Sequence, residues 1–246
     1  MRRVQLGIDV GGSSVKAGVV DVDSGQLLGE LVSAPTPLLS TPDAMMPVFA
    51  ELAAQLPTAQ GTVGIAFPSV IKNGRIRTAA NIHPSWLGVE GAAIAQQALG
   101  RPAVLLNDAD AAGVAEMRWG AGRGMAGTVI MLTFGTGIGT ALFIDGKLLP
   151  NTELGHMQMR GMDAEKWASA RVRTVLQLDW PAWIERVNGY LAQMHALFWP
   201  DLFVLGGAVS ERFTEFSPLL RSEAQIRPAF YAGQSGVIGA ALAAAE

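Results

Sequence analysis

The feature that most constrains the fold is a pattern of strand, glycine-rich turn, strand and hairpin turn that occurs twice in the chain. The copies align at their turns, Asp9-Val10-Gly11 with Thr133-Phe134-Gly135 and Ser24-Gly25 with Asp145-Gly146. Supersecondary units that recur in one chain indicate related structural parts. We therefore expect two lobes, each opening with a β-hairpin whose first turn is rich in glycine.

Apolar runs and breaker residues predict an α/β order of elements. The expected strands are 4–10, 15–22, 26–33, 62–67, 102–106, 128–133, 138–144, 147–149 and 202–205, and the expected helices are 42–55, 91–99, 109–119, 181–198 and 236–245. Two lobes with hairpin-containing mixed sheets describe the actin-like, ribonuclease-H-like ATPase architecture, in which the phosphate donor lies in a central cleft. We place the smaller lobe at 1–108, completed by the C-terminal helix at 236–246, and the larger lobe at 109–235.

The composition narrows the class of protein. Half of the 246 residues are hydrophobic and only 16% are charged, which predicts a folded core rather than disorder. The chain has no cysteine, which excludes disulfides and thiolate metal sites and fits a reducing cytoplasm. No apolar stretch approaches the ~20 residues that span a bilayer, so we expect no membrane association. The net charge of −3 argues against nucleic-acid binding, although Arg171 with Arg173 could form a local basic patch.

Both glycine turns can bind phosphate, because missing side chains let backbone N–H groups approach an anion. The candidate donor-binding residues are Gly11, Gly12, Ser13, Ser14 and Lys16 in the first turn, and Thr133, Gly135, Thr136 and Gly137 in the second. Asp9, at the end of its strand, is placed to hold Mg²⁺, directly or through water. Either turn alone could be an ordinary hairpin, whereas two of them can grip a phosphate chain from both sides.

Asn107 and Asp108 end a buried strand, and α/β proteins collect ligands at such carboxyl ends. A carboxylate there can take the proton of a hydroxyl that attacks phosphorus, so Asp108 is the candidate catalytic base. The alternative is that Asp108 or Asp110 caps the helix that follows. We assign the cap to Asp110 and catalysis to Asp108.

Glu153 and His156 can hydrogen-bond neighbouring hydroxyls of a sugar ring. A metal site is the other use of Glu-x-x-His, and we reject it because the sequence shows no third ligand nearby. Asn81 and Trp86 could offer an amide and an aromatic face to the same sugar, or be ordinary loop residues. We assign no functional role to His83, which we place in a loop, or to His195, which we place on an amphipathic helix.

Taken together in this order, the motifs resemble the ROK family of sugar kinases, and within it the short kinases that use polyphosphate and glucose. The resemblance runs nearly end to end, through 9–16, 78–86, 107–113, 133–140, 153–156 and 200–210. It implies glucose ligands at Asn81, Asn107, Asp108, Glu153, His156 and Glu165, and an adenosine motif at Gly206 and Gly207. It also implies Mg²⁺ as cofactor, polyphosphate or ATP as donor, glucose or mannose as acceptor, and a homodimer.

Two departures from the family pattern bear on the site. Many members carry a zinc-binding cysteine motif after the Glu-x-Gly-His segment, whereas 157–164 here contains no cysteine, so we expect no zinc site. Phe67-Pro68-Ser69 stands where relatives usually have Pro-Gly, which puts the shape of that loop in question.

Three other functions remain as alternatives. A type III pantothenate kinase would lack the Glu153–His156 sugar segment. A transcriptional regulator needs an N-terminal helix-turn-helix, for which the turn beginning at Asp9 leaves no room. A non-catalytic sugar sensor would keep the sugar ligands without turnover, and the presence of both Asp9 and Asp108 argues against it.

Overall fold

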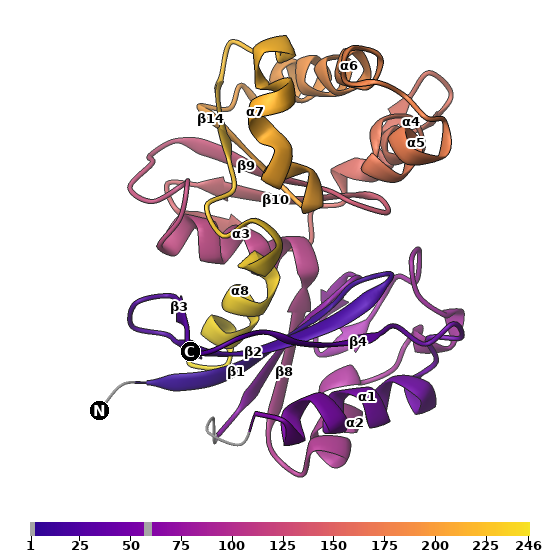
Figure 1. Cartoon of the computed structure of the whole chain (residues 1–246), viewed down its shortest axis with the longest axis vertical. Helices are drawn as coiled ribbons and strands as arrows, with labels where there is room; N and C mark the ends of the chain where they lie inside the picture. Colours follow the sequence, from indigo (N-terminus) through magenta and orange to yellow (C-terminus); the bar gives the residue numbers. More distant parts are fainter. Residues whose placement is uncertain (1–2, 57–60) are drawn as a thin grey trace. The chain divides into compact units, whose positions relative to one another are not determined.

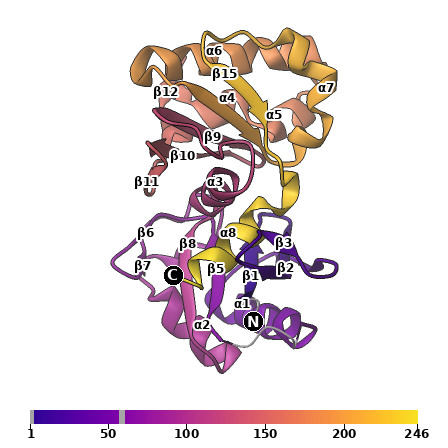
Figure 2. The ribbon, with the colours of Figure 1, turned by 90° about the vertical axis from the view of Figure 1, so that its left-hand side faces the viewer.

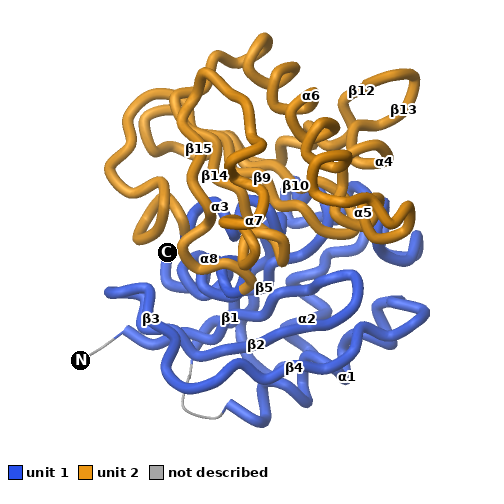
Figure 3. The backbone as a smooth tube through the Cα atoms, turned by 45° about the horizontal axis from the view of Figure 1, so that its top comes forward, with its two compact units in different colours: residues 1–115, 234–246 blue, residues 116–233 orange. Residues whose placement is uncertain are grey.

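The computed structural model describes residues 3–56 and 61–246, which form two compact units (Figure 3). Unit 1 comprises residues 1–115 and 234–246, and unit 2 comprises residues 116–233. The chain first passes from unit 1 to unit 2 inside helix α3 (Asp108–Arg118), where unit 1 ends at Ala115 and unit 2 begins at Glu116. We had placed this boundary after Asp108, at the start of the same helix.

Unit 1 is a mixed sheet with helices on both faces. Its strands are β1 (Val4–Val10), β2 (Ser14–Asp21), β3 (Gln26–Leu27), β4 (Val32–Pro35), β5 (Val63–Phe67) and β8 (Ala103–Asn107), and its other helices are α1 (Pro42–Ala54), α2 (Gly91–Leu99) and α8 (Ser235–Ala243). The sheet runs β3-β2-β1-β5-β8, with β4 also paired to β2. β1 and β2 are antiparallel, whereas β1, β5 and β8 are parallel.

Alternation along β1 explains how the helices cover this sheet. Leu6, Ile8 and Val10 pack in the core that also holds Met45 and Phe49 of α1. The alternate residues face α8, which lies along β1 and β5 (Figures 1 and 2). Glycine in β5 permits this close approach, because a Cβ on Gly64 would lie 1.7 Å from the Ala240 carbonyl oxygen. Helix α8 therefore sits on the sheet backbone itself.

Unit 2 repeats this sheet. Its strands are β9 (Thr128–Phe134), β10 (Ile138–Ile144), β11 (Lys147–Leu149), β14 (Leu202–Gly206) and β15 (Gln225–Pro228), in the order β11-β10-β9-β14-β15. β9 and β10 are antiparallel, and β9, β14 and β15 are parallel. The order of these five strands matches the path β3-β2-β1-β5-β8 of unit 1, which carries β4 in addition, and this confirms the internal repeat predicted from the two glycine turns.

Helices and a small hairpin complete unit 2: β12 (Gln158–Met159), β13 (Met162–Asp163), α4 (Ala164–Ala168), α5 (Ala170–Val175), α6 (Trp180–Phe198) and α7 (Phe213–Phe216). Asp179 caps α6 through a bond from the Ala182 N–H (N···O 2.9 Å). The buried side of α6, including Trp183, Val187 and Leu191, joins the core formed with β9 and β14. The helical apolar spacing thus predicted this element correctly.

Two local predictions were wrong, and several short elements were missed. The expected strand 26–33 is split into β3 and β4, with Gly29 between them at φ +95°. The expected loop after Pro68 contains a hairpin, β6 (Ile71–Lys72) and β7 (Arg75–Ile76), which turns at Asn73-Gly74 with positive φ at both residues. Asn-Gly is a strong signal for such a turn, so the sequence did carry it. The sequence analysis also missed β12, β13, α4, α5, α7 and β15. No helix among the described residues is long and apolar enough to cross a membrane.

Candidate functional site

The turn between β1 and β2 forms the first candidate phosphate site. Its Gly11 N–H donates to the Ser14 carbonyl (N···O 3.0 Å), and the Thr36 hydroxyl donates to the Gly11 carbonyl (O···O 2.6 Å). The Thr36 N–H donates to the Ser13 carbonyl (N···O 3.1 Å). Gly12 and Ser13 are exposed at the tip of the turn. The start of the loop after β4 therefore fixes this turn from the side and leaves its tip open to a ligand.

Asp9 lies on the α8 face of β1 and pairs in register with Lys16 of β2. Burial of the carboxyl group raises the pKa of Asp9 to about 6, and the Lys16 ammonium partly offsets this rise. Helix α8 begins directly against the carboxyl group, since a Cβ on Gly236 would lie 2.6 Å from Asp9 Cγ. A carboxylate enclosed in this way is a hard oxygen ligand whose charge a divalent cation would compensate.

Asn107 and Asp108 stand where β8 ends and α3 begins. The Asn107 side-chain oxygen accepts from the N–H groups of Ala109 (2.9 Å) and Asp110 (3.0 Å), so Asn107 caps the helix. Its amide nitrogen donates to the Ser69 carbonyl (3.2 Å). The cap that we assigned to Asp110 is thus made by Asn107. Asp108 is half-buried, and its carboxylate accepts from the Ala109 N–H (2.9 Å).

Ser69, at the departure from the family's Pro-Gly, has a defined structural role. Its side chain is buried, and its hydroxyl donates to the Thr78 carbonyl at 2.5 Å. The Val70 N–H in turn donates to the Thr78 hydroxyl (2.9 Å). Serine therefore ties this loop to the segment that leads to Asn81, and it holds Asn107 through its own carbonyl.

Trp86 does not offer the aromatic face to a sugar that we considered for it. Trp86 is 1% exposed, stacks edge-on against Phe67 (ring centroids 4.7 Å apart) and donates its indole N–H to the Ser40 carbonyl (2.6 Å). It is a core residue of unit 1. Asn81 is exposed in the bend before it. His83 bonds Ser85 at 2.8 Å, which agrees with its assignment as a loop histidine.

In unit 2 the turn between β9 and β10 forms the second candidate phosphate site. The Gly135 N–H donates to the Gly137 carbonyl, and the Arg171 N–H of α5 donates to the Gly135 carbonyl (both 3.0 Å). Gly135 and Thr136 are exposed. Gly206 lies beside Thr133 in the β14–β9 register. Gly207 has φ +83° and no room for a side chain, since a Cβ would lie 2.3 Å from the Phe134 carbonyl oxygen. The structure thus brings Gly206 and Gly207, the residues expected to bind adenosine, beside the second candidate phosphate turn.

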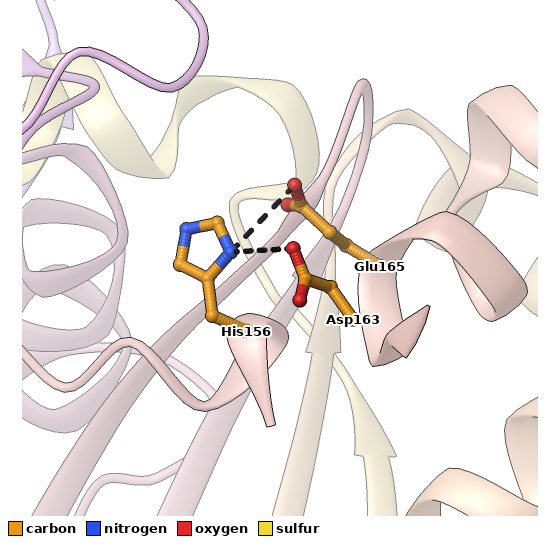
Figure 4. A group of neighbouring side chains, drawn as sticks. All are labelled: His156, Asp163 and Glu165. Carbon is orange, nitrogen blue, oxygen red and sulfur yellow. Dashed lines mark ion pairs between the residues drawn. The ribbon is translucent and has the colours of Figure 1, made fainter. Parts of the chain in front are cut away.

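Three carboxylates and one imidazole lie together near Ile138, where the turn enters β10. The Ile138 N–H donates to Glu165 (3.3 Å), which links the sugar motif to β10. His156 Nε2 lies 3.7 Å from Glu153 Oε2. His156 Nδ1 lies 3.5 Å from Asp163 and 3.9 Å from Glu165, as Figure 4 shows for these three side chains. Burial raises the pKa of Glu153; the His156 ring lowers it and the Glu165 carboxylate raises it further.

The structure corrects the reason that we gave against a metal at His156. We assumed that no third ligand lay nearby, but His156, Asp163 and Glu165 each place one ligand atom within 4.8 Å of the others. Asp163 was missed because it belongs to a hairpin, β12–β13, that the sequence did not reveal. Its position just before a short helix, α4, was the available signal.

Within unit 1 the structure places Asp9 beside Lys16, and Asn107 beside Asp108; within unit 2 it gathers Glu153, His156 and Glu165. Two matching sheets, each with a glycine-rich turn between its antiparallel strands, define the actin-like, ribonuclease-H-like ATPase class. The model of the ROK family matches residues 5–170, so the chain belongs to the ROK family.

Individual relatives agree with this assignment. The chain is 41% identical to the polyphosphate glucokinase of Mycobacterium tuberculosis strain CDC 1551, over 98% of this chain and 91% of the relative. Among solved structures it is similar to the inorganic polyphosphate/ATP-glucomannokinase of Arthrobacter sp. strain KM, with TM-score 0.96, 43% identity and 98% coverage of both chains. It is also similar to a ROK glucokinase of Streptomyces griseus in complex with glucose and AMPPNP, with TM-score 0.82, 25% identity and coverage of 97% and 98%.

Proposed function

We propose that the chain transfers a phosphoryl group from inorganic polyphosphate or ATP to glucose, forming glucose 6-phosphate. The observation that carries the proposal is the 41% identity to a polyphosphate glucokinase across 98% of the chain, a span that includes the candidate site residues of both units. The solved relative with 43% identity is described as using both donors, and this supports dual donor use here.

Asp108 is the proposed general base. It stands at the end of a parallel strand, half-buried, and Asn107 anchors its backbone through the cap of α3 and the bond to Ser69. Phosphoryl transfer depends mainly on positioning and charge neutralisation, and a base adds to this by accepting the proton of the attacking hydroxyl. Such assistance is typically worth ~10²–10⁴-fold in rate.

Sugar recognition is assigned to Glu153, His156 and Glu165 of unit 2 and to Asn81 and Asn107 of unit 1. The three residues of unit 2 form one polar cluster, which suits several hydroxyl groups of one ring. Both oxygen and nitrogen of the Asn107 amide already make bonds within unit 1, so its proposed contribution is chiefly to hold Asp108 in place.

Donor binding is assigned to the two glycine turns, with Gly206 and Gly207 beside the second. Mg²⁺ is the proposed cofactor, and Asp9 would hold it, directly or through water. The enclosed Asp9 carboxyl group, with its pKa raised to about 6, fits a cation ligand. When bound, the ion would neutralise negative charge on the transferred phosphoryl group.

The test is an initial-rate comparison of ATP, GTP and polyphosphate of defined length, each with glucose and with mannose. Turnover of glucose with polyphosphate or ATP is expected. Glucose binding by calorimetry without turnover with any of the donors would instead identify a sugar sensor and refute the proposal.

Asp108→Asn tests the base. The amide keeps the oxygen that accepts the Ala109 N–H, so the helix start should survive, but it accepts no proton from the sugar. We expect kcat to fall by at least ~100-fold with glucose binding retained. Asp179→Asn is the matched control, because the Asp179 carboxylate also accepts a backbone N–H at the start of a helix, that of Ala182 in α6 (N···O 2.9 Å), and Asp179 is not among the candidate site residues. Phosphorylation near the wild-type rate by Asp108→Asn would remove Asp108 as base.

Mannose as a second acceptor, a homodimeric assembly and a cytoplasmic site of action also belong to the proposal. The glucomannokinase relative supports the first, and the lack of cysteine fits the last. Light scattering coupled to gel filtration measures the assembly.

A further inference from the structure

We propose that Asp163 is a positioning residue for sugar binding, which accepts the Nδ1 proton of His156, holds the imidazole ring without a metal ion and so presents Nε2 to the sugar. The inference rests on the proposed function in one respect, that His156 contacts the sugar.

The ring of His156 has two different sides (Figure 4). Its Nδ1 faces two carboxylates, Asp163 Oδ2 at 3.5 Å and Glu165 Oε1 at 3.9 Å. Its Nε2 faces Glu153 Oε2 at 3.7 Å. A nitrogen between two carboxylates is stabilised when it carries a proton, because both neighbours only accept hydrogen bonds. In ligand-free proteins such contacts are often long and shorten when substrate binds.

Asp163 is itself held in place from two sides. The Gln158 side-chain amide donates to Asp163 Oδ1 (2.5 Å) across the β12–β13 hairpin, and the Lys166 ammonium lies 3.2 Å from Asp163 Oδ2. The hydrogen bond from Lys166, followed by that from Gln158, lowers the pKa of Asp163. The residue therefore stays a carboxylate, and Gln158 and Lys166 set its orientation.

The same contacts argue against a metal at this cluster. The oxygen nearest to Nδ1 is Asp163 Oδ2, which is also the oxygen that Lys166 contacts. A divalent cation ~2.0–2.2 Å from that oxygen would sit beside the ammonium group and be repelled by it. Lys166 supplies at Asp163 the positive charge that a metal would bring, and it leaves the Nδ1 proton in place.

The first test locates that proton by ¹⁵N-detected NMR of the imidazole rings. The chain has three histidines, so the imidazole signals that disappear in His156→Gln are those of His156. Spectra are followed through a pH series until the ring signals stop changing. We expect the limiting form to carry its proton on Nδ1. A proton on Nε2 would overturn the proposal, as would a shift of the Nδ1 signal on addition of one equivalent of Zn²⁺.

The second test is kinetic. Asp163→Ala should raise KM for glucose by about 10- to 150-fold, the range expected for losing a hydrogen bond to a charged group, and leave kcat and KM for the donor near wild type. Asp163→Asn keeps an acceptor oxygen and should recover most of the affinity. Loss of kcat without a change in KM, or no recovery with asparagine, would refute the positioning role.

Glu223→Ala is the matched control. Glu223 lies 3.4 Å from His195 Nε2, another histidine–carboxylate pair, and it is 81% exposed. Its removal should change neither the His156 signals nor the kinetics. The NMR result does not require turnover, so failure of the proposed function and failure of the Asp163 assignment can be told apart.

Discussion

Replacing Asp9 by asparagine should stabilise the ligand-free protein at neutral pH while it removes activity. The folded-state pKa of Asp9, about 6, lies above its ordinary value of 3.8 because burial disfavours the carboxylate. A group whose pKa is raised by folding binds more protons in the folded than in the unfolded state between these two values. Stability is therefore lost as the pH rises from about 4 to about 6, and the full penalty applies above pH 6.

The size of the effect follows from the shift. About two pKa units correspond to roughly 3 kcal/mol at 1.36 kcal/mol per unit. Asparagine is neutral in both states and escapes this penalty, in which the attraction of Lys16 is already included, so a gain of up to about 3 kcal/mol is expected above pH 7. At pH 4 wild type and variant should unfold alike, because Asp9 is then protonated in the folded protein.

Urea unfolding with chelator at pH 4 and pH 8 measures this difference. Mg²⁺ should then stabilise the wild type at pH 8 and not the variant, because only the wild type offers the carboxylate. Asp23→Asn is a control whose stability change should have the opposite sign. The hydrogen bond from Arg3 lowers the pKa of this exposed carboxyl group, so its loss should destabilise the protein at pH 8. A variant less stable than wild type at pH 8, or a gain of equal size at pH 4, would refute the account of Asp9.

Two further substitutions test the surroundings of the first turn. Gly236→Ala places a methyl group 2.6 Å from Asp9 Cγ, so the carboxylate must move. The Mg²⁺ concentration needed for the half-maximal rate should therefore rise. Unchanged Mg²⁺ dependence would contradict this packing. Thr36→Val removes the hydroxyl that donates to the Gly11 carbonyl, which should destabilise the protein by about 1 kcal/mol in urea unfolding and raise KM for the donor. An equal rise in KM for glucose would contradict a role confined to the donor turn.

The sequence by itself determined the repeated hairpins, the five longer helices and the position of Asp108. These features depend on neighbours along the chain: strand alternation, glycine at the turns of 11–14 and 134–137, and the apolar spacing of α6. The hairpins fix β1 beside β2 and β9 beside β10, whereas the places of the parallel strands β5, β8, β14 and β15 came from the tertiary structure. The same local logic overlooked the Asn73-Gly74 turn, and it failed at short elements such as β12 and β13 that carry no strong pattern.

Only the tertiary structure decided what each polar or aromatic side chain faces. Trp86 looked suited to stack on a sugar, but Phe67 and Ser40 enclose it in the core. Asn107 caps α3 because the end of β8 leads directly into that helix. Asp163 reaches His156 through a short hairpin with no strong pattern of its own, and α8, from the far end of the chain, encloses Asp9. The physical reason is that burial and side-chain contacts arise between segments far apart in sequence, which local patterns do not encode.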